Sequence, residues 1–188
     1  MTSKLLKNLK AILSSNEYQF QYKQIVDMNN EVQQLKGNGF TGFKTVSELM
    51  DNHGMIPSSS GVYVCLRVKD TEPEFLEIGS GGFFKRSEPR NPNVSMAELK
   101  ANWVEEAAVV YIGKATNLKT RLCAYLRFGE GKFATHWGGR YIWQLKDSRD
   151  LVVCWKTTEE NPRTVEERMI AEFKTAHNGQ RPFANLQD

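Results

Sequence analysis

Two tyrosines, an arginine and a glutamate are residues of this chain whose side-chain types could serve the hydrolysis of a phosphodiester. Tyr63 ends the triplet Gly-Val-Tyr at the start of an apolar run, and Tyr111 begins the triplet Tyr-Ile-Gly at the end of another. Arg121 and Glu166 follow further along the chain. Hydrolysis needs an oriented water and cations that stabilise the charge of the transition state. Arginine grips phosphate oxygens, and a carboxylate binds a hard divalent ion together with waters and substrate.

A sheet and two helices must bring these residues together. Apolar alternation or continuous apolar runs predict strands over 61–68, 107–112 and 151–156. Asn117 is expected to cap a helix that runs to about Phe128. Thr164 and Glu167 form the S/T-x-x-E pattern of a capping box, which predicts a helix from there to about residue 176. Residues 141–145 fit a short helix or a strand. The order of elements predicts an α/β (α+β) fold with a small sheet and flanking helices.

The two triplets, Arg121, Glu166 and a terminal Pro182-x-x-Asn185 resemble, in this order, the catalytic core of the GIY-YIG nuclease superfamily. The resemblance covers about residues 58–188. The run Tyr-Ile-Gly-Lys-Ala over 111–115 is similar to the sequence of the second motif in excision-repair members of the UvrC type. The resemblance implies a three-stranded mixed sheet flanked by helices. It also implies a metal-dependent endonuclease that uses Mg²⁺ or Mn²⁺.

The resemblance makes Glu166 the expected metal ligand. In the family, the glutamate is followed after two residues by an aliphatic pair and then by an aromatic residue. Glu166 meets this pattern with Met169-Ile170 and Phe173, whereas Glu167 and Glu172 do not. These two acids stay open as alternatives, and a carboxylate that merely favours a helix N-terminus is the structural alternative.

The other roles that the resemblance implies fall on residues of the two motifs and the chain end. Arg121, eight positions after Gly113, would clamp the transition state, and the amide of Asn185 would stabilise the site by hydrogen bonds. Tyr63 and Tyr111 would face each other across paired strands, one accepting the proton of the water and the other orienting it. The sequence does not choose between them.

A phenol with a pKa near 10 is a poor base until cations lower that value. Lys114, Arg121 and the metal would supply those cations. Tyr125, four positions after Arg121, shares its helix face and would support the nucleophile or the phosphate. The structural alternatives are tyrosines that fill a pleated surface, a surface arginine and a packed helix aromatic.

Charge is concentrated at the second triplet, although the net charge is only +3. Between positions 111 and 140 the bases are Lys114, Lys119, Arg121, Arg127, Lys132 and Arg140, against the single acid Glu130. Such a block suits phosphate, and its alternative is a solvated helix face. The expected substrate contacts are Gly113, Lys119, His136, Arg140, Lys85 and Arg86. A histidine, a tryptophan and an arginine around Gly138-Gly139 suit base stacking and phosphate binding.

The chain departs from the family at two places. Residues of about 69–106 form a long insertion between the first two core strands, with a glycine-rich stretch near Lys85 and a helix expected over about 95–103. This insertion suits either a flexible phosphate-contacting arm or a cap. Residues 1–57 are expected to form a helical extension, with Val32 and Leu35 on one helix face and a break at residues 37–39.

Composition excludes several classes of protein. The chain has 188 residues and 40% apolar residues, which suits one domain with extensions. Cys65, Cys123 and Cys154 are far apart and odd in number, which favours a reduced, cytoplasmic protein without a zinc site or disulfide framework. No stretch approaches the roughly 20 apolar residues of a membrane helix.

The sequence therefore predicts a metal-dependent endonuclease, with DNA as the expected partner, a homodimer on the substrate as a further expectation, and no membrane partner. Restriction or defence, repair and mobile-element roles stay open, as does the choice between DNA and RNA. The alternative is a nucleic-acid-binding module of the same fold without catalysis. A third hypothesis is a purely structural domain.

Overall fold

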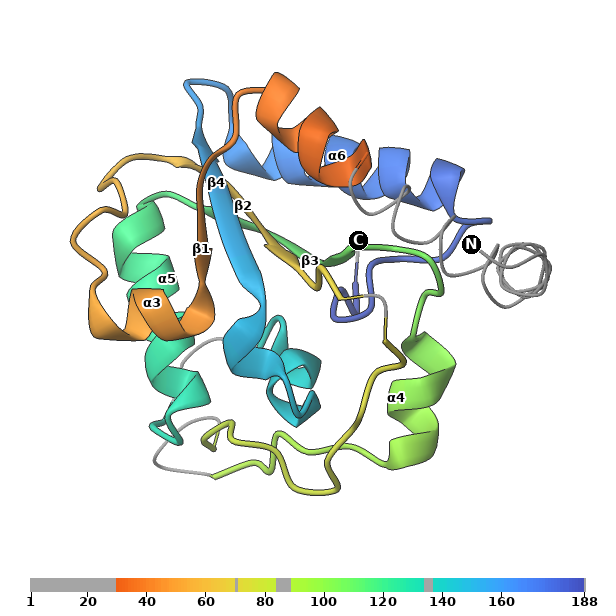
Figure 1. Ribbon diagram of the computed structural model, residues 1–188. Coiled ribbons are helices and arrows are strands. Elements are labelled where there is room, and N and C mark those ends of the chain that lie inside the picture. Colours follow the sequence, from red (N-terminus) through yellow and green to blue (C-terminus); the bar gives the residue numbers. More distant parts are fainter. Residues whose placement is uncertain (1–29, 70, 84–88, 134–136, 188) are drawn as a thin grey trace, which may run out of the picture.

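The computed structural model describes residues 30–69, 71–83, 89–133 and 137–187. Its centre is a four-stranded sheet in the order β1-β4-β2-β3 (Figure 1). The strands are β1 (Thr41–Thr45), β2 (Gly61–Leu66), β3 (Val109–Ala115) and β4 (Val152–Thr157). All pairings between them are antiparallel. The α+β class is confirmed, but the expected three-stranded mixed sheet is wrong in strand number and direction.

The additional strand, β1, lies within the segment expected to be helical, and local irregularity hid it from sequence inspection. Gly42 has a φ of +91° and Phe43 a φ of +50°, and the register with β4 shifts between Thr41 and Lys44. A Cβ on Gly42 would lie only 2.6 Å from the indole ring of Trp155. Such a strand lacks the regular alternation from which strands are predicted.

Helices cover both faces of the sheet (Figure 1). The helix of residues 30–37 and α6 (Pro162–Ala176) pack on one face, where they bury Val62, Val64, Leu66, Ile112 and Cys154. On the other face, α3 (Val46–Asp51) and α5 (Leu118–Gly129) pack over Tyr63, Cys65 and Tyr111. Successive residues of a strand point to opposite faces, so one strand supplies both cores.

The ends of the helices follow from their caps. Asn117 caps α5 as expected, since its Oδ1 accepts the Thr120 N–H at 2.9 Å. The predicted start of α6 at Thr164 is wrong, because Asn161 is the N-cap and Pro162 lies in the first turn. Proline suits this position, since its fixed φ is helical and it has no N–H to leave unpaired. Glu167 pairs with Arg163 instead of closing a capping box.

The insertion between β2 and β3 contacts the core at several places in its described part, through Phe75, Val94, Met96, Leu99 and Trp103. It contains the expected helix, α4 (Met96–Asn102), which Ser95 caps. The Gln144 amide lies in η1 (Arg140–Gln144) and donates to the carbonyls of Leu76 and Val94, both at 3.0 Å. A Cβ on Gly79 would lie 2.2 Å from the Trp143 carbonyl oxygen. These contacts favour the cap over the flexible arm for the described part.

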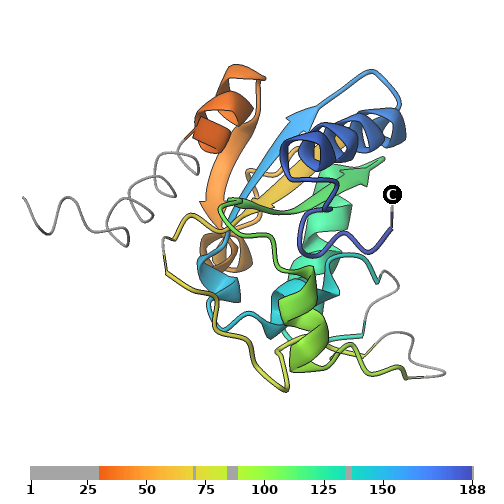
Figure 2. The same ribbon diagram turned by 90° about the vertical axis from the view of Figure 1, so that its right-hand side faces the viewer.

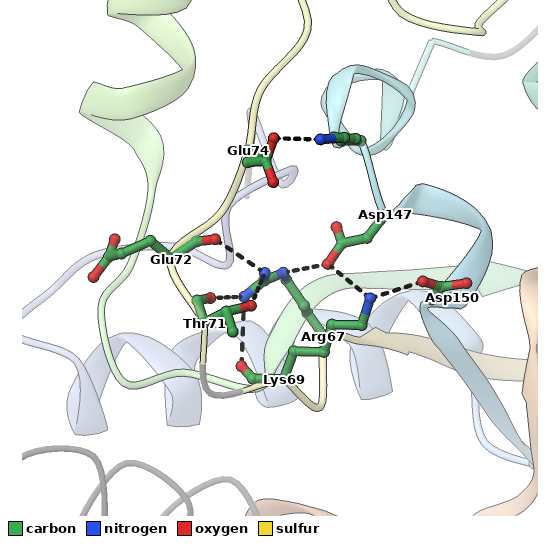
Figure 3. A network of polar contacts seen from close by, with 8 residues as sticks. Arg67, Lys69, Thr71, Glu72, Glu74, Asp147 and Asp150 are labelled. Atoms are coloured by element: carbon green, nitrogen blue, oxygen red, sulfur yellow. Dashed lines mark hydrogen bonds and ion pairs between the residues drawn. The ribbon is translucent and has the colours of Figure 1, made fainter. Parts of the chain in front are cut away.

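A buried arginine joins the start of this insertion to Asp147, the residue before η2 (Ser148–Asp150) (Figure 3). Arg67 is 5% exposed, and its Nε donates to Asp147 Oδ2 at 2.9 Å. Its other nitrogens donate to the carbonyls of Thr71 and Glu72 at 2.5 and 3.3 Å. One side chain therefore binds a turn of the insertion to a segment 80 positions away.

In the described ranges, no helix combines the length and apolarity needed to cross a membrane.

Candidate functional site

Most of the expected catalytic residues lie at or next to the free edge of β3. A cleft of about 1090 Å³, here called the β3 cleft, is lined by β3, α5, the first turn of α6, residues 137–140 and the C-terminal segment 184–187. Figure 2 shows α5 and α6 on opposite sides of β3, with the C-terminal segment beside the strand. An edge strand suits such a site because one side of it is open to a ligand.

Strand pairing brings the two tyrosines together, as the resemblance implied. Tyr63 pairs with Gly113 and Cys65 with Tyr111, so the two rings lie diagonally on one face. Their centroids are 5.9 Å apart and the planes are inclined by 60°. Tyr63 is fully buried, and its hydroxyl accepts from Arg121 Nε at 3.2 Å. Tyr111 and Arg121 line the cleft, whereas Tyr63 lies behind them.

Gly113 makes room for this arrangement. A Cβ at this position would lie 2.5 Å from Tyr63 Cζ and 2.7 Å from its hydroxyl oxygen. Gly113 was expected to contact the substrate, but it lies beneath the Tyr63 ring and is absent from the lining of the β3 cleft.

Tyr125 extends the aromatic group into α5. Its ring stacks on Tyr111 with 6.2 Å between centroids and 15° between planes, and its hydroxyl donates to the Gly139 carbonyl at 3.2 Å. A Cβ on Gly138 would lie 2.7 Å from the Tyr111 hydroxyl. The two glycines therefore let residues 137–140 fold closely over Tyr111.

Burial dominates the acid–base properties of these phenols. It raises the pKa of Tyr63 and places the pKa of Tyr111 and Tyr125 well above the ordinary value, although the charge of Arg121 acts in the opposite direction. For Arg121, burial lowers the pKa, but the hydroxyls of Tyr63 and Tyr111 outweigh it and raise the pKa overall. At neutral pH the phenols are therefore neutral and act as hydrogen-bond donors and acceptors.

A lysine and a glutamate face the cleft from the α6 side. Lys114 Nζ forms an ion pair with Glu166 Oε2. Glu166 is 8% exposed and lines the cleft, whereas Glu167 and Glu172 are exposed and do not line it. Of the three competing acids, the geometry brings only Glu166 to the tyrosines and Arg121.

These residues fit a metal held by one carboxylate. Among the described residues there is no group of three or more His, Cys, Asp or Glu side chains that could hold an ion. A hard ion such as Mg²⁺ often binds one or two carboxylates and takes its remaining ligands from water and substrate phosphate. Glu166, paired with a single lysine at an open cleft, is a donor of this kind.

Asn185 closes part of the open edge of β3. Its amide donates to the Ile112 carbonyl at 2.8 Å, and its Oδ1 accepts the Ile112 N–H at 2.9 Å. The Ala184 N–H also donates to the Val110 carbonyl at 2.9 Å. The side chain of Asn185 thus replaces the neighbouring strand that the edge lacks, and it holds residues 184–187 as one wall of the cleft.

The remaining expected contacts divide into three groups. Arg140 lines the cleft, whereas Lys119 does not. His136, Lys85 and Arg86 lie outside the described residues. Sequence inspection missed Asn161 and Arg163, which line the cleft from the start of α6. The Asn161-Pro162 pair, a common start of a helix, was the available signal.

The lining of the cleft is mainly basic. Among the described residues that line it, the basic side chains are Lys114, Arg121, Arg140 and Arg163, and the acidic side chain is Glu166. Comparison with family models, curated proteins and solved structures finds no match to this chain. Its function is therefore argued from its own residues.

Proposed function

We propose that this protein is a divalent-metal-dependent endonuclease that hydrolyses phosphodiester bonds in DNA. The observation that carries the proposal is the β3 cleft, where Tyr111 and Arg121 face the Lys114–Glu166 pair across an open strand edge. Phosphate binding, charge stabilisation and a metal ligand are the requirements of the reaction, and this cleft offers a group for each.

The buried hydrogen bond from Arg121 to Tyr63 gives the two tyrosines different roles. Tyr63 has no access to the cleft and holds Arg121 through its hydroxyl, so its role is positioning. Tyr111 lines the cleft, and its neutral hydroxyl orients the attacking water by a hydrogen bond. As the water oxygen bonds to phosphorus, its proton passes to solvent in the open cleft, and the bond from phosphorus to the leaving oxygen breaks. Arg121 and Lys114 stabilise the negative charge that develops on the phosphate oxygens.

Glu166 would hold Mg²⁺ or Mn²⁺. Such an ion, when bound, polarises the phosphate and stabilises the leaving oxygen. Because Lys114 pairs with the same carboxylate, a cation held by Glu166 would compete with the lysine, and Lys114 would then be available to the phosphate.

Cleavage of supercoiled plasmid and structured oligonucleotides with Mg²⁺, Mn²⁺ or EDTA tests the proposal. Glu166→Ala should abolish metal-dependent cleavage, and Arg121→Ala should slow it by about 10²–10³-fold, as for other groups that stabilise a developing anion. Glu172→Ala is the matched control, since Glu172 is an exposed residue of the same helix that lies outside the cleft. Cleavage that survives Glu166→Ala would refute the assignment of the metal ligand.

The Lys114–Glu166 pair also favours a second candidate function, a nucleic-acid-binding module without catalysis. In that case the lysine neutralises the carboxylate permanently and the cleft binds phosphate by charge alone. Binding would then need no metal and no variant would cleave. A cytoplasmic location, and a homodimer that cuts both strands, belong to the nuclease proposal, and the size of the complex on DNA tests the latter.

A further inference from the structure

A second hollow adjoins the β3 cleft. This hollow, here called the α4 groove, has a volume of about 500 Å³ and lies between α4 of the insertion and residues 179–186. It shares Arg140, Asn185 and Leu186 with the β3 cleft. The two hollows are therefore neighbours, and Arg140 lies where they meet.

Arg140 is held in place by aromatic rings. Its Cζ lies 4.9 Å from the centroid of the Trp137 ring and 4.9 Å from that of Tyr141. The Tyr141 hydroxyl donates to Glu98 on α4, which fixes that ring in turn. Within the described part of the chain, the buried Arg140 Nε has no hydrogen-bond partner. A guanidinium that is already oriented loses little conformational freedom when it binds a ligand.

The charges of the α4 groove suit a phosphate backbone. In the part of the chain that the structure describes, Arg140 and Arg181 line it against one acid, Glu98. Glu98 keeps its charge when it accepts from the Tyr141 hydroxyl, and the two arginines against this one carboxylate leave the described lining net positive. The neighbouring Trp137 adds an aromatic surface that suits stacking with a base.

We propose that Arg140 binds a backbone phosphate adjacent to the one in the β3 cleft, and that the nucleic-acid strand continues from there into the α4 groove. The proposal takes from the proposed function only that nucleic acid is the ligand. It gives the insertion a role in binding, because α4 forms the outer wall of the path that the nucleic-acid strand follows.

Binding of fluorescently labelled single-stranded and duplex DNA in EDTA, at several salt concentrations, tests this path. Arg140→Ala and Arg140→Met should each weaken binding about tenfold and lower the slope of log Kd against log salt by about one, as expected for one lost phosphate contact. Arg140→Met retains a long side chain between the two rings. Arg149→Ala, which removes an exposed charge outside both hollows, should leave the affinity and slope unchanged.

A second pair of variants tests the α4 groove itself. Ala101 is an exposed residue of α4 that lines the groove, whereas Ala97 is an exposed residue of the same helix that does not. Ala101→Glu should weaken the binding of long oligonucleotides severalfold, and Ala97→Glu should not, because only the first places a negative charge on the path.

Wild-type affinity and salt slope in both folded Arg140 variants would overturn the inference. Equal affinities of the Ala101→Glu and Ala97→Glu variants would overturn the path through the groove. Binding that depends on Arg140 without cleavage under any metal would support the inference and refute the nuclease. Cleavage by a protein whose DNA binding does not depend on Arg140 would support the nuclease and overturn the inference.

Discussion

Replacing Gly113 by alanine is the change that most directly tests how the two tyrosine motifs fit together. The added Cβ would lie 2.5 Å from Tyr63 Cζ and 2.8 Å from Cε1. Carbon atoms in contact are normally about 3.5–4.0 Å apart, so one partner must move by about 1 Å. Gly113 lies within the paired stretch of β2 and β3, so the backbone resists this movement and the Tyr63 ring must turn.

The cost follows from what the ring then loses. A side chain forced about 30° from its rotamer costs about 0.5–1.5 kcal/mol. The hydrogen bond from Arg121 to the Tyr63 hydroxyl, which involves a charged donor, contributes about 1.5–3 kcal/mol. Tyr63 is fully buried, so no water replaces this partner. The free energy of unfolding should therefore fall by about 2–4 kcal/mol.

Urea denaturation followed by tryptophan fluorescence measures this loss. The matched control is Gly37→Ala at the end of the 30–37 helix, since a Cβ there meets no atom within 4 Å. This control should be neutral or up to about 1 kcal/mol more stable. If Gly113→Ala is as stable as the control, the contact between Gly113 and the Tyr63 ring does not exist as described. In the nuclease proposal, Gly113→Ala should also slow cleavage, because Arg121 loses its support.

Three further changes test other contacts. Asn185→Ala should lower the free energy of unfolding by about 2–3 kcal/mol, because both polar backbone groups of Ile112 lose their partner. An unchanged urea midpoint would show that water replaces the amide. Arg67→Met should cost about 3–5 kcal/mol since it removes the buried partner of Asp147, which keeps the exposed Lys69 at 3.6 Å, whereas the exposed-pair control Lys146→Met should cost at most about 1 kcal/mol. Burial raises the pKa of Tyr125, so the unfolded chain loses its phenol protons first, and stability should fall as the pH rises above about 10. Denaturation between pH 8 and 11 measures this fall, and Tyr125→Phe should make it shallower.

Residue pattern predicted those elements of the fold that are regular. β2, β4 and α5 follow from apolar periodicity and from the Asn117 cap, because local backbone preference and burial agree there. β1 could not be predicted in this way. Its register shift and the position of Gly42 under the Trp155 indole depend on contacts with a strand more than 100 positions away. The start of α6 was misplaced because two capping patterns overlap within four residues, and Pro162 decides between them.

The candidate site was predicted as a set of residue types but not as a geometry. The order of the motifs indicated Tyr111, Arg121 and Glu166, and the structure brings all three to one cleft. Spacing along the chain could not show that Tyr63 lies behind Arg121, nor that Gly113 accommodates a ring. Both depend on the register of β2 against β3, which a shift of one residue would reverse.

The edge position of β3 links the stability of the fold to the shape of the cleft. An edge strand exposes backbone groups, and this chain satisfies those of Ile112 with the Asn185 side chain. The same segment supplies Leu186 and Asn185 to both the β3 cleft and the α4 groove. The contact that protects the edge therefore also sets one wall of each hollow. A residue that touches no substrate can thus determine whether the cleft and the groove form one continuous path.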